Sequence, residues 1–156
     1  MLDIFFFTIT SLFLIAIFLT DALYFSIPDE LVIPAIVIIF ILQILRKTPT
    51  PALLIAAAIA GGFFLLQYFV SHGAWIGSGD IKLGILIGLI LGIQKAILAL
   101  FIAYGIGLLF ATALIMFKNK TRTTKFPFGT LLVAATLISL FLGDDLISRY
   151  RALARF

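Results

Sequence analysis

Two aspartates, Asp21 and Asp80, stand where acidic residues are costly. Asp21 interrupts an apolar sequence, and Asp80 follows the glycine-rich run that starts at Gly77. A charge at the centre of a membrane helix costs about 2.5–3.5 kcal/mol, so it needs a partner, water or a function. Two adjacent carboxyl groups can cleave a peptide bond, because one deprotonates a water while the other, protonated, binds the scissile carbonyl. Such a pair titrates as a unit, so the sequence assigns neither role to either residue.

The composition places the whole chain in the membrane class. Of the 156 residues, 63% are hydrophobic and 12% are charged, and the mean hydropathy is +1.29. Soluble domains are about 45–50% apolar and about a quarter charged, and a chain this small has too little interior for so many apolar side chains. We therefore predict an all-α integral membrane protein, a bundle of about six transmembrane helices of about 20 residues each.

Uncharged runs locate these helices within one membrane domain that covers residues 1–156. The fourth run is short for a bilayer, and its glycines Gly84, Gly88 and Gly92 recur every four residues, which predicts a groove for a closely packed helix. Asp3 stands where a signal peptide would carry a basic residue, so we expect the first helix to remain in the mature protein. The predicted helices are about 4–25, 29–45, 51–69, 80–94, 96–117 and 127–143.

Charge and residue counts exclude several classes of function. The chain has no cysteine and one histidine, His72, so we expect no disulfide, no metal site and no cofactor. Its basic residues are scattered between apolar runs and do not form a nucleic-acid surface. The balance of basic residues favours an outside N-terminus and a cytoplasmic face that carries both Asp21 and Asp80. That face would also carry a cluster of basic residues: Lys118, Lys120, Arg122 and Lys125.

Each of these features alone has an ordinary structural explanation. An aspartate at a helix end is most often a cap, and glycines at four-residue spacing are ordinary in packed helices. Two other functions therefore stay open. Asp21 and Asp80 could be relay groups of a small ion- or proton-coupled transporter, although the sequence shows no internal repeat of the kind such proteins carry. Alternatively, the glycine groove could dock a partner in an assembly subunit.

Three short motifs in chain order distinguish between these alternatives. Together they resemble the motifs of the type IV prepilin peptidases, and the second one, GxGDxKL, also names the wider GxGD class of membrane aspartyl proteases. The resemblance covers essentially the whole chain. The motifs are Asp21 followed after five residues by Ile27-Pro28-Asp29-Glu30, then Gly77-Ser78-Gly79-Asp80-Ile81-Lys82-Leu83, and then Phe126-Pro127-Phe128-Gly129.

The resemblance implies a multi-pass aspartic endopeptidase of the cell (inner, cytoplasmic) membrane. Such an enzyme removes the basic leader from type IV pilin-like or archaellin-like precursors at the cytoplasmic face, and it needs no metal for proteolysis. Asp21 and Asp80 then correspond to the two catalytic aspartates. The supporting motif residues are Gly77, Gly79, Lys82, Pro28, Asp29, Pro127 and Gly129.

The chain departs from the family pattern in two places. Thr130 replaces the final proline of the third motif, PFGP, and we expect this change to touch no catalytic group. The N-terminal extension and four-cysteine zinc site of the bifunctional members are missing, so we expect no N-methylation of the product. From position alone, Lys82 could orient the aspartate pair electrostatically or extend towards lipid phosphate, and we expect the second. The groove beside the fourth helix could receive the apolar segment of the precursor.

Overall fold

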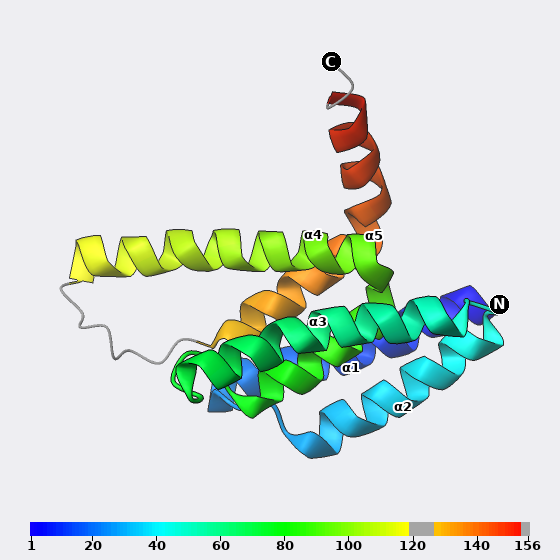
Figure 1. The fold of residues 1–156 in the computed structure, drawn as a ribbon, viewed down its shortest axis with the longest axis horizontal. Coiled ribbons are helices and arrows are strands. Elements are labelled where there is room, and N and C mark those ends of the chain that lie inside the picture. Colours follow the sequence, from blue (N-terminus) through cyan, green and yellow to red (C-terminus); the bar gives the residue numbers. More distant parts are fainter. Residues whose placement is uncertain (119–126, 154–156) are drawn as a thin grey trace.

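The fold consists of helices that run side by side and bring their ends into two polar regions. The structure is a computed structural model that describes residues 1–118 and 127–153. Figure 1 shows α1, α3 and the first part of α4 lying together, with α2 diverging below them. In chain order the helices are α1 (Leu2–Tyr24), α2 (Asp29–Leu45), α3 (Thr50–Ser71), α4 (Ser78–Lys118) and α5 (Phe128–Leu153).

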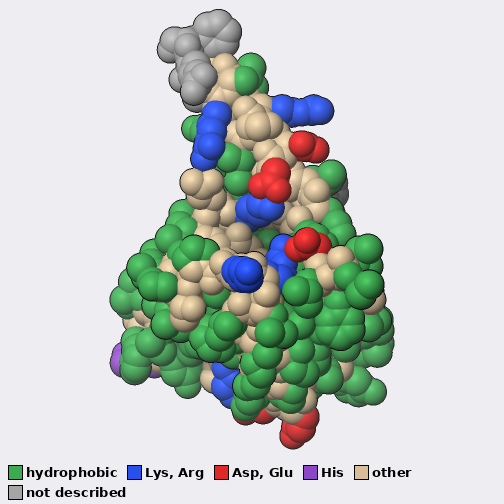
Figure 2. All heavy atoms as spheres, turned by 90° about the vertical axis from the view of Figure 1, so that its right-hand side faces the viewer, with side chains coloured by type: hydrophobic (Ala, Val, Ile, Leu, Met, Phe, Trp, Pro, Cys, Tyr) green, Lys and Arg blue, Asp and Glu red, His purple; other side chains and the backbone are tan. Residues whose placement is uncertain are grey.

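Four of the helical stretches are long and apolar enough to cross a membrane. The surface agrees with that reading, because large apolar side chains such as Ile4 and Phe101 are 73% and 79% exposed. Figure 2 shows a largely hydrophobic flank on which the charged side chains gather in a few places. So much exposed apolar surface is unfavourable in water and is expected to contact the acyl chains of a bilayer. The predicted all-α membrane fold is confirmed, and about six helices is compatible with it.

The long helix α4 is broken at Gly92. This glycine has φ 69° and ψ 177°, a backbone conformation that is essentially confined to glycine. Figure 1 shows the chain turning back at this point, so that α4 has a first arm over 78–91 and a second arm over 93–118. The predicted boundary at Lys95 is therefore wrong. A long charged side chain can leave the bundle from within a helix, whereas reversing the chain needs a residue without a Cβ.

The glycines of the first arm explain how α3 and α4 pack. A Cβ at Gly88 would lie 2.4 Å from the carbonyl oxygen of Ala56, and one at Gly84 would lie 2.9 Å from that of Ala60. The predicted groove thus exists at these two glycines and is filled by α3. The expectation that this groove receives the precursor is wrong, and Gly92 makes the break without lining the groove.

Gln43 of α2 compensates the break in α4. Its Nε2 group donates to the carbonyl oxygens of Leu89 and Ile90, at 2.7 and 3.3 Å. These carbonyls end the first arm, where the break removes the amides that would otherwise bind them. Because Gln43 is only 4% exposed, this side chain replaces hydrogen bonds that water could not easily supply.

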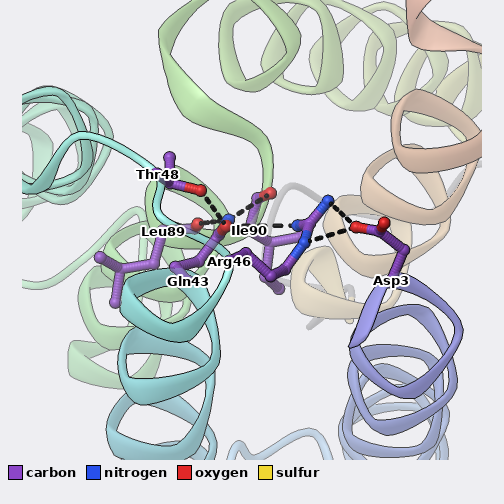
Figure 3. A network of polar contacts seen from close by, with 6 residues as sticks. All are labelled: Asp3, Gln43, Arg46, Thr48, Leu89 and Ile90. Atoms are coloured by element: carbon purple, nitrogen blue, oxygen red, sulfur yellow. Dashed lines mark hydrogen bonds and ion pairs between the residues drawn. The ribbon is translucent and has the colours of Figure 1, made fainter. Parts of the chain in front are cut away.

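The same network continues outward to the start of α1 (Figure 3). The Oε1 atom of Gln43 accepts hydrogen bonds from Thr48 and Arg46, at 2.9 and 3.2 Å. Arg46 also pairs with Asp3 at 2.8 Å, and its guanidinium lies 4.1 Å from the ring centroid of Phe6. We call these contacts of Asp3, Gln43, Arg46 and Thr48 the far-end network.

Helix α5 is longer than predicted. It continues ten residues beyond position 143, because its charged last turns find partners on α4. Lys95 pairs with Asp144 at 2.6 Å, and Arg151 donates to Gln94 at 2.9 Å. In Figure 1 the last part of α5 projects from the bundle. The predicted basic cluster from Lys118 to Lys125 lies outside the residues whose side chains are described, and the single-domain assignment stays a prediction.

Candidate active site

Asp21 sits in the last turn of α1, at the opposite end of that helix from Asp3. The helix ends at Tyr24, and Phe25 takes a left-handed conformation, with φ 54°, while its amide donates to the carbonyl oxygen of Asp21. The side chain of Asp21 points into the bundle and is 5% exposed. A carboxyl group so deeply buried requires hydrogen-bond donors around it.

Asp80 is the third residue of α4 and is 9% exposed. The backbone amide of Gly77 donates to its Oδ2 atom at 3.0 Å. An acidic side chain that reaches back to the amide before the first turn stabilises a helix start, because that amide has no partner within the helix. The glycine-rich turn thereby fixes Asp80 at the mouth of the first arm.

Ile27, in the loop between α1 and α2, joins the two aspartate regions. A Cβ at Gly79 would lie 3.0 Å from the Cβ of Ile27, and one at Gly129 would lie 3.0 Å from its Cδ1. The two motif glycines therefore allow the starts of α4 and α5 to close on either side of one side chain. In the described residues, no hydrogen bond joins Asp21 and Asp80, and each side chain has its own donors.

Thr130 holds Asp21 directly, which sequence reasoning missed. Its backbone amide donates to the Oδ2 atom of Asp21, and its Oγ1 donates to the same atom at 2.8 Å. The expectation that the replacement of proline touches no catalytic candidate is therefore wrong. The first turn of α5 points the backbone amide of Thr130 at the end of α1, and Gly129 lets the two helices approach.

Lys82 binds Asp29 rather than extending towards lipid. Its Nζ atom lies 2.5 Å from Oδ1 of Asp29, and the two side chains are 33% and 54% exposed. The expectation of a lipid-facing Lys82 is wrong because α2 begins at Asp29, directly after Pro28, and so presents an acid beside α4. This ion pair connects the first motif to the second.

Aromatic side chains connect the second arm of α4 to the start of α5. The rings of Tyr104 and Phe128 have centroids 4.9 Å apart, and the hydroxyl of Tyr104 donates to Oε1 of Gln67 at 2.9 Å. No motif marks Tyr104 or Gln67. The signal available was the aromatic residue within the third motif, which indicated that some partner packs there.

Eight of the nine predicted site residues lie at one end of the bundle. Each of them either contacts another residue of this set or of its surroundings, or is next in the chain to one that does. The ninth, Pro127, lies immediately before α5 and is half-buried. In the described residues, no three His, Cys, Asp or Glu side chains lie close enough to form a metal site. Two buried carboxyl groups held by uncharged donors can exchange protons with water, which is acid–base chemistry.

Comparisons with known proteins agree with this arrangement. Residues 8–112 match the model of the type IV leader peptidase family. A Bacillus subtilis (strain 168) protein named prepilin leader peptidase/N-methyltransferase is 28% identical over 142 residues, which cover 90% of this chain and 57% of that protein. The chain thus spans little more than half the length of this curated relative. No solved structure matches this chain.

Proposed function

Because this chain belongs to the type IV leader peptidase family, we propose that it is a membrane aspartic endopeptidase for type IV pilin-like or archaellin-like precursors. The observation that carries the proposal is the burial of Asp21 and Asp80 at the same end of the bundle. Like charges near each other in a buried place are costly, so such a pair suits chemistry better than it suits stability.

In the proposed reaction, one carboxylate takes a proton from a water molecule whose oxygen attacks the scissile carbonyl carbon. The other carboxyl group, protonated, hydrogen-bonds to the carbonyl oxygen as charge develops there. When the tetrahedral intermediate collapses, the C–N bond breaks and the leaving amine takes a proton from the pair. Among the described residues, each aspartate uses Oδ2 for its hydrogen bonds, which leaves Oδ1 for water or the carbonyl.

The proposed substrate has a basic leader followed by an apolar helix, so its cleavage site lies at a membrane surface. We place the reaction at the cytoplasmic face of the cell membrane, where the basic cluster predicted from the sequence would also lie. Asp29 and Glu30 are exposed acids at the start of α2, beside the site. Lys82 already pairs with Asp29, so we expect Glu30 and the aspartate pair to attract the leader.

Cleavage of a purified precursor tests the proposal. The chain, purified in detergent, is incubated with a pilin-like precursor, and mass spectrometry locates the new N-terminus. We expect Asp21→Asn and Asp80→Asn each to lower the rate about 10³-fold or more, because general acid–base groups contribute about 10²–10⁴-fold. Both variants should keep the unfolding temperature of the wild type within a few degrees.

The matched control is Asp3→Asn, which changes an acid at the other end of α1. It should cleave at the wild-type rate, because among the described residues the side chain of Asp3 pairs with Arg46 of the far-end network. Cleavage by Asp21→Asn or Asp80→Asn at the wild-type rate would contradict the assignment of the pair. A wild-type chain that cleaves no pilin-like or archaellin-like precursor would contradict the peptidase proposal itself.

A further inference from the structure

We propose that Thr130 is a positioning residue for Asp21, which it holds by two hydrogen bonds to a single carboxylate oxygen. The inference rests on the proposed peptidase function and adds a residue to it. Thr130 stands outside the matched motif positions, and the family pattern has proline there. A proline could supply neither of the two donors, since it has no backbone N–H and no hydroxyl.

The geometry is specific because both donors converge on Oδ2. The amide of Thr130 belongs to the first turn of α5, where amides have no partner within the helix, and its Oγ1 lies 2.8 Å from the same oxygen. Two bonds from one residue fix both the position and the rotation of the carboxyl group. The other oxygen, Oδ1, accepts no hydrogen bond in the described part of the chain and is thereby oriented for water or substrate.

Close packing leaves Asp21 little freedom to rearrange if these bonds are lost. A Cβ at Gly129 would lie 2.9 Å from both Cγ and Oδ2 of Asp21, so the carboxyl group rests against the backbone of α5. Asp21 is 5% exposed, so water cannot readily replace the lost donors. The position of a reacting group matters at this scale, since an error of about 1 Å can cost about 10²-fold in rate.

Three substitutions at position 130 keep both donors, one donor or neither donor. Thr130→Ser keeps the amide and the hydroxyl, Thr130→Val keeps only the amide, and Thr130→Pro keeps neither while restoring the family motif. Precursor cleavage by each purified variant gives kcat and KM, and thermal unfolding gives the folded fraction. The matched control is Thr136→Val, which deletes a buried hydroxyl on the same helix. In the described part of the chain this hydroxyl donates to the carbonyl oxygen of Leu132, at 2.7 Å.

We expect Thr130→Ser to match the wild type, Thr130→Val to lose about 10-fold in kcat, and Thr130→Pro to lose about 100-fold. KM should stay constant across the series, because Thr130 acts on Asp21 and not on the precursor. Thr136→Val should keep the wild-type kcat. If Thr130→Pro does not fold, the comparison of Ser with Val decides the matter.

The outcomes separate this inference from the proposed function. A wild-type chain that cleaves, with Thr130→Val at the same kcat, overturns the positioning role and leaves the peptidase proposal intact. A loss of kcat in Thr130→Ser equal to that in Thr130→Val also overturns it, because the hydroxyl would not be the cause. A wild-type chain that cleaves no precursor overturns the peptidase proposal, and the positioning role with it.

Discussion

The two ends of the helix bundle use polar side chains in opposite ways. At the far end, Gln43 donates two hydrogen bonds through Nε2 and accepts two through Oε1, and Arg46 pairs with Asp3 (Figure 3). At the other end, Asp21 and Asp80 are buried, and in the described residues no cation pairs with either of them. Both regions lie where helices begin or end. In the described residues, the far end pairs its acid with a cation, whereas the buried aspartates at the other end have no cation partner.

The difference separates groups that hold the fold from groups suited to chemistry. Buried polar networks stabilise a fold when each member has its partners, whereas incomplete ones cost free energy. Among the residues that the structure describes, Asp21 and Asp80 accept hydrogen bonds from uncharged donors, each through one oxygen. Lys82 is two positions after Asp80, but its ammonium group pairs with the exposed Asp29 and not with either buried aspartate. An arrangement that tolerates this cost is expected where reactivity is required.

Gly129→Ala should have a large effect on activity, because it moves the carboxyl group of Asp21 without changing its chemistry. The added Cβ would lie 2.9 Å from the carboxyl carbon of Asp21, closer than any real contact, so the carboxyl group must shift. We expect about a 10²-fold loss of precursor cleavage, with the folded fraction preserved in a thermal unfolding experiment. An alanine variant that cleaves at the wild-type rate would show that the position of Asp21 is not critical.

The control for this change is Gly62→Ala in α3, where an added Cβ has no atom within 4 Å. Alanine is favoured over glycine in a helix by about 1 kcal/mol, so this variant should be as stable as the wild type or more stable. Its cleavage rate should be unchanged. Together the two alanines separate an effect on the site from a general effect of glycine replacement.

Much of the fold followed from the apolar runs, and the site followed from motifs. The bounds of α1, α2 and α3 lie within two residues of the predicted helices, because prolines, charges and, after α3, the polar run Ser71-His72-Gly73 mark their ends. The break at Gly92 escaped prediction because the same four-residue spacing as Gly84 and Gly88 indicated packing. Only the backbone conformation distinguishes a glycine that turns the chain from one that receives a helix.

The parts of the site that the sequence could not predict depend on contacts between distant segments. Thr130 and Asp21 are 109 positions apart, and nothing local to either residue indicates that a hydroxyl of one meets the carboxylate of the other. The same holds for Ile27 between the two motif glycines. Motif spacing identified which residues belong together, whereas the donors that orient them depend on how α5 packs on α1.

Gln43→Leu, at the far end, should reduce the stability of the fold while leaving the chemistry of the aspartate pair intact. The change removes the donors for the carbonyls of Leu89 and Ile90, and buried groups left without partners cost about 1–3 kcal/mol each. We expect a lower unfolding temperature in detergent and a wild-type kcat for the folded fraction. Gln94→Leu, which removes an exposed contact to Arg151, is the control and should change the unfolding temperature little. A folded Gln43→Leu variant with much lower kcat would mean that the far end controls the site.

The smallest effect should come from the exposed ion pair between Lys82 and Asp29. Its side chains are 33% and 54% exposed, and exposed pairs contribute about 0.2–1 kcal/mol, which is reduced further by salt. We therefore expect Lys82→Gln, Asp29→Asn and the double variant to lose a few-fold at most in cleavage. If the pair acts only by joining α2 to α4, the double variant should lose no more activity than either single variant. A double-mutant cycle in unfolding experiments measures this coupling.

A loss of cleavage rate in Lys82→Gln comparable to that in Asp80→Asn, without a matching loss in Asp29→Asn, would mean that Lys82 acts on the precursor or on the aspartate pair. In that case the two ends would differ less than their contacts indicate, because a cation would belong to the chemistry as well.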